Sequence, residues 1–562
     1  MLRLPNLLAS RKGRLTAFFM LYITEGIPLG FAATAVASQL RRMGVGPAEI
    51  GAFVASFYLP WAFKWAFGPM VDVFRSQRFG HRRAWIMGTQ LMLAATLLML
   101  IWVPLPQGLA LFTGILLIHN TFGAMQDVAI DALAVNSLGE DERGLANGLM
   151  FAGASLGQAI GGAGVLFLLP YTGFQGSFVL VAAAILMVTT LVVLPMREAI
   201  ATQLVQLHGR SRLQAISAEM RGFAVQAFQS FLGSRAAFAA VFFALLPMGA
   251  MSLSLALQSG LAVELGMKDS ALAQLTLVSS LTSGVCMVVG GLLSDRLGQR
   301  RMLAFYTALM SLPVLYMAWV LHSHGYQMPR APGGAPLPAL IQQLWIATIA
   351  FNVGMGLMYG TRTAVFMDVT NPRVAGTQFT AYMAMMNLAI AFAATWQGIA
   401  VEALGYPLTL LIDAGAGLLG LLLLPLMAKI GPADGLCDAH AEGRARIMAR
   451  ALGLLCLGFV PYLLYADPAG AMVGIANTLF TLVFVASALF LYAGTLLQTL
   501  SPGQQRLCRW LALALLAIYL RRFAPAEAEV LVQALCCAVA AAAGLLLMQL
   551  GGRVWTGLRQ QA

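Results

Sequence analysis

Charged residues are scarce in this sequence. Only 10% of its 562 residues are Asp, Glu, Lys or Arg, whereas 60% are hydrophobic, and the mean hydropathy is +0.81. Soluble domains carry about 25% charged residues, because such side chains cover the surface that faces water. The shortage excludes a single soluble globular domain of this length and indicates that most of the chain is surrounded by lipid.

Motifs that support enzyme chemistry are also missing. The sequence contains no Gly-rich loop that ends in Lys-Ser or Lys-Thr and could hold nucleotide phosphates. Its six cysteines follow no spacing typical of a metal site or a disulfide framework. We therefore expect no enzyme activity, no cofactor and no bound metal.

The net charge of +12 raises the question of a nucleic-acid partner. The basic residues, however, fall mainly in alternate connections between apolar segments, which is the positive-inside pattern of membrane proteins. Four of them, Arg3, Arg11, Lys12 and Arg14, precede the first apolar segment. We therefore expect no nucleic-acid partner, and we expect the N-terminus to lie in the cytoplasm.

Long apolar segments fill most of the chain. Each has about the 20 residues that a membrane-spanning helix needs, and their continuous apolar character favours helices over the alternating strands of a barrel. Twelve of them run at 15–36, 50–69, 84–104, 109–134, 145–168, 177–195, 236–262, 272–292, 302–321, 339–366, 377–402 and 407–428. The sequence therefore predicts an all-α membrane protein.

A basic connection, residues 196–235, separates the first six segments from the next six. We predict two six-helix halves, residues 1–195 and 236–428, joined by this cytoplasmic linker. Residues 429–562 follow as an accessory region with further apolar runs at 451–466, 470–497, 507–520 and 529–549. About four extra transmembrane helices are expected there, or only two, because the third run is short for a span.

The loops after the second and the eighth segments share a pattern. In each, an aspartate follows a glycine by four residues, and a second glycine and two arginines come later, as expected of related halves. Each aspartate ends a helix, where it can accept charge-assisted hydrogen bonds. The alternative is that both loops only set the topology. The residues are Gly68, Asp72, Arg82 and Arg83 in the first copy, and Gly291, Asp295, Arg296, Gly298, Arg300 and Arg301 in the second.

Two ionisable residues inside the first two segments are candidate functional positions. A charge at the centre of a bilayer costs about 2.5–3.5 kcal/mol, so an ionisable residue there is a candidate functional residue. Glu25 lies near the middle of the first segment, where Gly26 and Pro28 are expected to loosen the helix. Lys64, one of only four lysines, lies in the second segment, where the alternative is that it anchors the helix at the membrane surface.

The fourth segment contains Gln126, Asp127 and Asp131. The two aspartates are four residues apart and share one helix face. Two carboxyl groups in a low-dielectric cavity favour the uptake of a proton, which a proton-coupled carrier needs. We expect Asp127 to be the deeper residue, with a solvated Asp131 as the alternative. Arg362 corresponds to Asp131 when the halves are aligned, and we predict that the two pair when the cytoplasmic side closes.

Several stretches in both halves carry a family resemblance. They are Phe63-Lys64-Trp65, Gly68-Pro69-Met70-Val71-Asp72, Gln126-Asp127-Val128-Ala129-Ile130-Asp131-Ala132, Glu142-Arg143-Gly144 and Gly376-Thr377-Gln378-Phe379-Thr380. Together they resemble the AmpG-type branch of the major facilitator superfamily, which includes muropeptide permeases, acetyl-CoA carriers and siderophore importers. The extra C-terminal segments are similar to those of AmpG-like permeases.

The resemblance implies a monomeric carrier in the bacterial inner membrane that imports a sizeable, partly anionic solute together with protons. Anhydro-muropeptides from cell-wall turnover are the preferred solute, Lys64, Asp127 and Asp131 become cavity residues, and the duplicated loops become a latch between the halves. Similar muropeptide permeases have an arginine where Ser155 stands, so a siderophore or acyl-CoA solute stays open. A further alternative is a transporter-derived sensor or assembly protein that moves no solute.

Overall fold

The computed structural model of this chain is helical throughout the part that it describes. That part comprises residues 6–73, 76, 80–138, 143–198, 211, 214, 217–218, 222, 229–247, 249–371, 375–427, 440–465, 473–495, 500–518, 521 and 529–550. Within it, eleven helices are long and apolar enough to cross a membrane. The prediction of an all-α, multi-pass membrane protein is confirmed.

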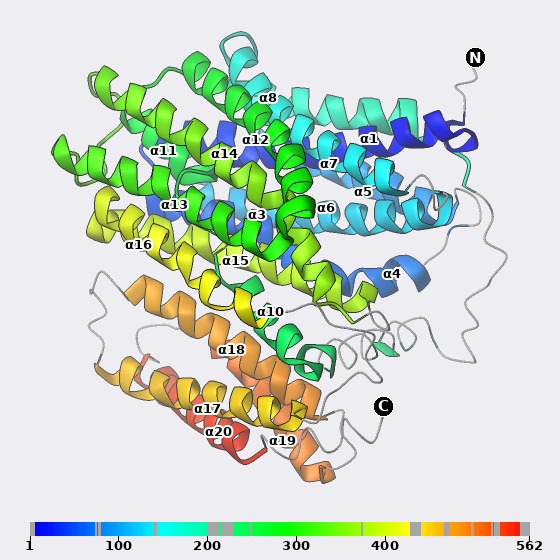
Figure 1. The fold of residues 1–562 in the computed structure, drawn as a ribbon, viewed down its shortest axis with the longest axis vertical. Helices are drawn as coiled ribbons and strands as arrows, with labels where there is room; N and C mark the ends of the chain where they lie inside the picture. The colour runs from blue at the N-terminus through cyan, green and yellow to red at the C-terminus, as the bar shows by residue number, and fades with distance from the viewer. Residues whose placement is uncertain are drawn as a thin grey trace. The chain divides into compact units, whose positions relative to one another are not determined.

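The chain divides into two compact units. Unit 1 comprises Met1–Met220, Ala244–Val365 and Met383–Leu422, and unit 2 comprises Arg221–Phe243, Phe366–Tyr382 and Leu423–Ala562. Figure 1 shows the helices of unit 1 from blue to yellow and the accessory helices of unit 2 in orange and red. Each unit is described separately below.

The first half of unit 1 contains the helices of the first six predicted segments. A continuous helix, Arg11–Arg42, consists of α1 (Arg11–Gly30), a π-helical segment η2 (Phe31–Val36) and α2 (Ala37–Arg42). Then follow α3 (Pro47–Ala62), η3 (Lys64–Ala66), α4 (Gly68–Val73), α5 (His81–Leu100), α6 (Leu109–Ser137), α7 (Arg143–Ala159), η4 (Ile160–Gly164), α8 (Val165–Val188) and η5 (Thr189–Val193). Gly173, with a φ of 68°, interrupts α8 and separates the fifth span from the sixth.

In chain order, the second half begins with a broken span, and most of its first helix belongs to unit 2. Helix α10 (Arg235–Leu245) is followed by non-helical backbone before α11 (Leu255–Glu264). The next helices are α12 (Asp269–Leu297), α13 (Gln299–Ser323), α14 (Pro338–Asp368) and α15 (Ala375–Leu404). The last span combines α16 (Tyr406–Leu418) with the short turns η7 (Leu419–Leu422) and η8 (Leu424–Leu426).

The break in the seventh span corrects the continuous segment predicted at 236–262. The Asp413 carboxylate, fully buried on α16, accepts the backbone N–H groups of Met251 at 2.7 Å and Ser252 at 2.8 Å. Gln397 of α15 donates to its other oxygen at 2.8 Å. A broken helix at membrane depth needs such replacement partners for its backbone groups. Asp413 therefore stabilises the interruption.

Close packing of glycines joins α1 to α7, which lie side by side in Figure 1. A Cβ atom added to Gly26 would lie 2.0 Å from the Ala154 carbonyl oxygen, and one on Gly161 would lie 1.9 Å from that of Ile27. Gly153 and Gly157 approach the backbone of α1 in the same way. Small residues every fourth position allow membrane helices to approach this closely. Gly26 thus serves packing. Helix α1 stays helical through Gly30, and the π-helical segment η2 begins three residues after Pro28.

Two faces of unit 1 are named for use below. The near face is the end at which the first helix begins, and the far face is the end at which that helix finishes. Asn6 exchanges two hydrogen bonds with the Arg197 backbone, so the start of the chain and the start of residues 196–235 lie at the same near face. The chain reverses at the far face around residues 43–46 and 265–268.

Unit 2 contains four accessory helices among its described residues. They are α17 (Ala441–Tyr465), α18 (Val473–Thr495), α19 (Pro502–Ala517) and α20 (Glu529–Leu550). The rings of Phe459 and Phe484 meet edge to face at 4.8 Å in their shared core. Within the described residues of this unit, α17 and α20 have the length and hydropathy of a membrane span. Helix α19 has 16 residues, so the third run is confirmed as short.

Candidate transport site

A break in the second span positions Lys64. Pro60 lies near the end of α3, and the following 3₁₀ turn η3 carries the lysine. Its Nζ lies 2.8 Å from Asp127 Oδ2 and 3.9 Å from Asp131 Oδ2, both on α6. The two aspartates therefore share one helix face, as their spacing predicted, and that face is directed at the lysine.

Tyr22 of α1 completes this arrangement. Its hydroxyl donates a 2.6 Å hydrogen bond to Asp131 Oδ1, so the two oxygens of that carboxylate face different partners. Sequence reasoning missed this residue, although Tyr22 and Glu25 are three positions apart and share a helix face. We refer to Tyr22, Glu25, Lys64, Asp127 and Asp131 as the Lys64 cluster.

Burial differs sharply within the Lys64 cluster. The side chain of Asp127 is 5% exposed and that of Lys64 is 17% exposed, whereas the side chain of Asp131 is 46% exposed. Asp127 is thus the deeper aspartate. Asp131, which lies closer to the near-face end of α6, is partly exposed while it accepts its hydrogen bond from Tyr22.

Within the Lys64 cluster, Glu25 has the least complete hydrogen bonding. Its Oε1 is buried and has no hydrogen-bond partner in the described structure, yet it lies within electrostatic range of Asp127, Asp131 and Lys64. Gln126, next to Asp127, donates to Thr24 Oγ1 at 3.2 Å, and its own Oε1 is buried without a partner. Unsatisfied buried polar atoms are costly, so each of them needs an explanation, and the exchange of a proton or a ligand is one.

Arg362 is a buried cation on α14. Its guanidinium carbon lies 4.4 Å from the centre of the Tyr359 ring, and its side chain is 5% exposed. Its Nε has no hydrogen-bond partner in the part of the chain that is described. Among the ion pairs of the described residues, none joins Arg362 to Asp131, and the pair stays a prediction for a state closed at the cytoplasmic side.

The duplicated loops have matching backbone geometry. Gly80 has a φ of 89° directly before α5, and Gly298 has a φ of 98° directly before α13. Only glycine adopts this conformation readily, which explains the second glycine of each copy. The side chains of Asp72 and Asp295 lie outside the described residues, so their predicted hydrogen bonds stay a prediction.

The arginines of the two copies have different surroundings. The Arg83 guanidinium donates to the carbonyl oxygens of Val193, at 3.0 Å, and Leu194. The backbone N–H of Arg82 donates to Glu198 at 2.8 Å. In the second copy, Arg296, Arg300 and Arg301 are exposed. Hydrogen bonds therefore join the first copy of the loop to the end of the sixth predicted segment and the residues after it.

The chain belongs to the major facilitator superfamily, whose family model matches residues 15–257 and 237–556. Among curated relatives, putative transporter AmpG 4 of Rickettsia conorii is 27% identical over 190 residues, which are 33% of this chain and 45% of that protein. The anhydromuropeptide permease of Escherichia coli K12 is 24% identical over 428 residues, 73% of this chain and 79% of the permease. The resemblance to AmpG-type transporters is confirmed.

Solved structures support the fold. A D-xylose-proton symporter superposes with a TM-score of 0.54 at 13% identity and covers 74% of this chain and 98% of the symporter. A variant of the peptide transporter POT also reaches 0.54 at 15% identity, over 74% of this chain and 94% of its own. The chain therefore contains a complete transporter fold and additional residues beyond it.

Proposed function

We propose that this protein is a proton-coupled importer that carries anhydromuropeptides across the bacterial inner membrane into the cytoplasm, with its N-terminus on the cytoplasmic side. The observation that carries the proposal is the imbalance of the Lys64 cluster, in which one lysine faces three carboxyl groups. In a low-dielectric site a single cation does not balance three anions, so the cluster favours binding a proton.

Lys64 connects proton binding to solute binding. In the described state its ammonium group is held by Asp127 at 2.8 Å. A proton on Asp127 weakens that ion pair and frees the ammonium group for an anionic group of the solute. Proton and solute then favour each other's binding, and this mutual effect is what a coupling free energy between two sites means.

The release step follows from the exposure of Asp131. When the cluster is open to the near face, a proton on Asp127 can leave through its neighbour Asp131, one turn away and 46% exposed. Lys64 then returns to Asp127 and the solute loses its cation. Arg362 supplies a second buried cation for a solute with two anionic groups.

The choice of anhydromuropeptides rests on the Escherichia coli relative of that name, which matches 73% of the chain. The matched segments of the Rickettsia relatives cover only 45% of those proteins, so they add support for the class and none for the solute. Ser155, where similar permeases have an arginine, donates to the Phe151 carbonyl oxygen at 3.0 Å and adds no charge.

Uptake of a radiolabelled anhydromuropeptide into proteoliposomes tests the proposal. An acidic exterior should drive accumulation above the external concentration, and collapsing the pH gradient with a protonophore should abolish it. The Lys64→Ala variant should show neither accumulation nor exchange. Accumulation that is indifferent to the pH gradient would refute proton coupling, and the absence of any exchange with wild-type protein would refute this solute.

A further inference from the structure

A second polar cluster lies at the far face of unit 1, at the ends of α2 and α11. Its centre is Glu264, the last residue of α11, whose side chain has 0% exposure. We refer to Arg41, Glu264, Tyr326, Arg330 and Tyr406 as the Glu264 cluster. Arg41 comes from the first half, and the other four residues come from the second half.

Both carboxylate oxygens of Glu264 are fully used. Oε1 accepts hydrogen bonds from Arg41 Nε at 2.8 Å and from the Tyr406 hydroxyl at 2.7 Å. Oε2 accepts from the Tyr326 hydroxyl at 2.8 Å and from the backbone N–H of Arg330 at 3.0 Å. Four donors on one buried carboxylate compensate for the loss of its hydration.

Arg41 is satisfied in the same way. Besides its bond to Glu264, Nη1 donates to the Val45 carbonyl at 2.9 Å and Nη2 donates to the Arg330 carbonyl at 2.6 Å. Its side chain is 5% exposed. Separating the halves at the far face would break the contacts to Glu264 and Arg330 together, because those partners belong to the other half.

A more exposed ring of contacts surrounds this centre. Arg42 forms an ion pair with Asp269 at 2.9 Å and donates to the Met267 carbonyl at 2.8 Å. The Glu402 carboxylate accepts the backbone N–H of Ala48 at 3.0 Å. All of these contacts join the first half to the second, so polar bonds hold the far face closed from the rim to the centre.

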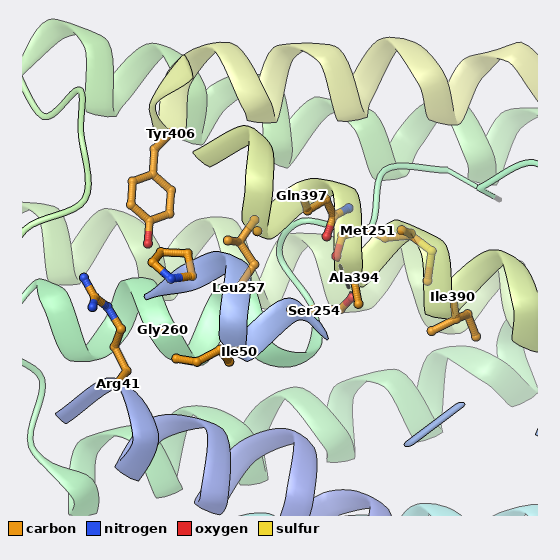
Figure 2. Close-up of a pocket in the computed structure, with 14 residues that line it drawn as sticks. Arg41, Ile50, Met251, Ser254, Leu257, Gly260, Ile390, Ala394, Gln397 and Tyr406 are labelled. Atoms are coloured by element: carbon orange, nitrogen blue, oxygen red, sulfur yellow. Dashed lines mark hydrogen bonds between the residues drawn. The ribbon is translucent and has the colours of Figure 1, made fainter. Parts of the chain in front are cut away.

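The pocket on the side of Arg41 and Tyr406, between residues of the two halves, is too small for a solute. Figure 2 shows a pocket with Arg41 and Tyr406 at one end and Ser254, Leu257 and Gln397 along it. Its cavity volume is about 20 Å³, which holds roughly one water molecule. At the same time Asp131 keeps 46% exposure. The far face is therefore closed by polar contacts while Asp131, nearer to the near face, is partly exposed.

We infer that Glu264 is the positioning residue of an outer gate, the shared acceptor that holds the two halves together at the far face until a solute is admitted there. The closure itself stands on the contacts above and needs neither a particular solute nor a proton. The statement that solute enters at the far face rests on the proposed direction of transport.

Thiol labelling tests the gate without any transport. Ser254→Cys places a thiol in the pocket below Arg41 and Tyr406, and a membrane-impermeant maleimide is added to intact cells and, separately, to inverted membrane vesicles. Glu264→Gln puts an amide NH₂ where four donors converge, so it should open the gate and raise the labelling rate by about tenfold on one of the two sides.

Milder and matched variants keep the test decisive if Glu264→Gln fails to fold. Tyr326→Phe removes one donor and should give a smaller increase, and Arg41→Lys keeps the charge but cannot bridge Glu264, Val45 and Arg330. Glu49→Gln removes an exposed far-face carboxylate on α3 and should change nothing.

Equal labelling rates in the Glu264, Tyr326 and Arg41 variants and in the parent, from both sides, would overturn the gate. This outcome is independent of the proposed function, because a protein that moves no anhydromuropeptide can still show the increase. Conversely, normal proton-driven uptake together with unchanged labelling would leave the proposed function standing without this gate.

Discussion

The Lys64 cluster and the Glu264 cluster both lie in unit 1, but they differ in how completely their buried charged groups are paired. The Lys64 cluster belongs to the first half alone, has more carboxyl groups than cations and leaves Glu25 Oε1 without a partner. The Glu264 cluster joins both halves and gives every oxygen of its carboxylate two donors.

The difference separates two tasks. A site that gains and loses a proton or a solute in each cycle cannot have all of its hydrogen bonds and ion pairs made beforehand. A fully paired group would lose free energy of interaction by exchanging its partner. A contact that closes one side has to be stable until it opens as a whole. The four predictions below test this division, from the largest expected effect to the smallest.

Neutralising the deeper aspartate should have the largest effect. Asp127→Asn removes the group whose protonation frees Lys64, so uptake driven by a pH gradient should fall by about 5- to 150-fold, the usual range of a coupling free energy. Exchange of labelled for unlabelled solute in proteoliposomes should survive, because Lys64 still binds the solute. Glu442→Gln, an exposed carboxylate paired with Arg446 on α17, is the control. Normal accumulation in the Asp127 variant would remove this cluster from coupling.

The Glu264 cluster should dominate stability. Arg41→Met leaves a buried carboxylate without its cation, and breaking such a pair costs about 3–5 kcal/mol. The apparent melting temperature of the purified protein in detergent should therefore drop clearly. Asp131→Asn, at a side chain with 46% exposure, should cost no more than about 1 kcal/mol. If the two variants melt alike, the two clusters do not differ as described.

Removal of the Tyr22 hydroxyl should have a moderate effect on transport. Tyr22→Phe deletes a 2.6 Å hydrogen bond to the partly exposed Asp131, and a typical hydrogen bond contributes about 0.5–1.5 kcal/mol net. We expect pH-driven uptake to fall several-fold and its pH profile to shift, with exchange largely retained. Tyr171→Phe, at a residue with 87% exposure, is the matched control. A pH profile identical to that of wild type would limit Tyr22 to packing.

The smallest effect is expected in the duplicated loop. Asp295→Asn removes a charge that we predict to be used only while the near face is closed, so uptake should fall by about two- to fivefold, an effect of up to roughly 1 kcal/mol. Membrane insertion, followed by the amount of folded protein in detergent, should be unchanged. Unaltered uptake at normal expression would leave the motif as a topology signal alone.

The spans and the Lys64 cluster could be predicted because their signals are local. An apolar run of about 20 residues is dictated by the thickness of the bilayer, and a charge inside such a run is conspicuous in the sequence itself. Lys64, Asp127 and Asp131 can be recognised in this way from the sequence alone. Their distances and the part played by Tyr22 required the packing of three helices.

The Glu264 cluster could not be predicted in the same way. Arg41 and Glu264 lie at helix ends, where charged residues are ordinary, and 223 positions separate them. Their pairing depends on how the two halves assemble. The break in the seventh span did leave a signal, because Pro247 and Gly249 lie within it and Gly249 has a φ of 73°. That signal was masked by the apolar composition on either side.

The continuous helix Arg11–Arg42 carries residues of both clusters, since Tyr22 and Glu25 lie in its middle and Arg41 near its end. At a rise of 1.5 Å per residue, the 16 residues from Glu25 to Arg41 span roughly 24 Å. Because α7 lies against α1 with backbone-to-glycine contacts, the two helices can move together as one rigid body. A tilt of this helix that moves Arg41 away from Glu264 would therefore also displace Tyr22 and Glu25, so that opening of the far face and rearrangement of the Lys64 cluster are coupled.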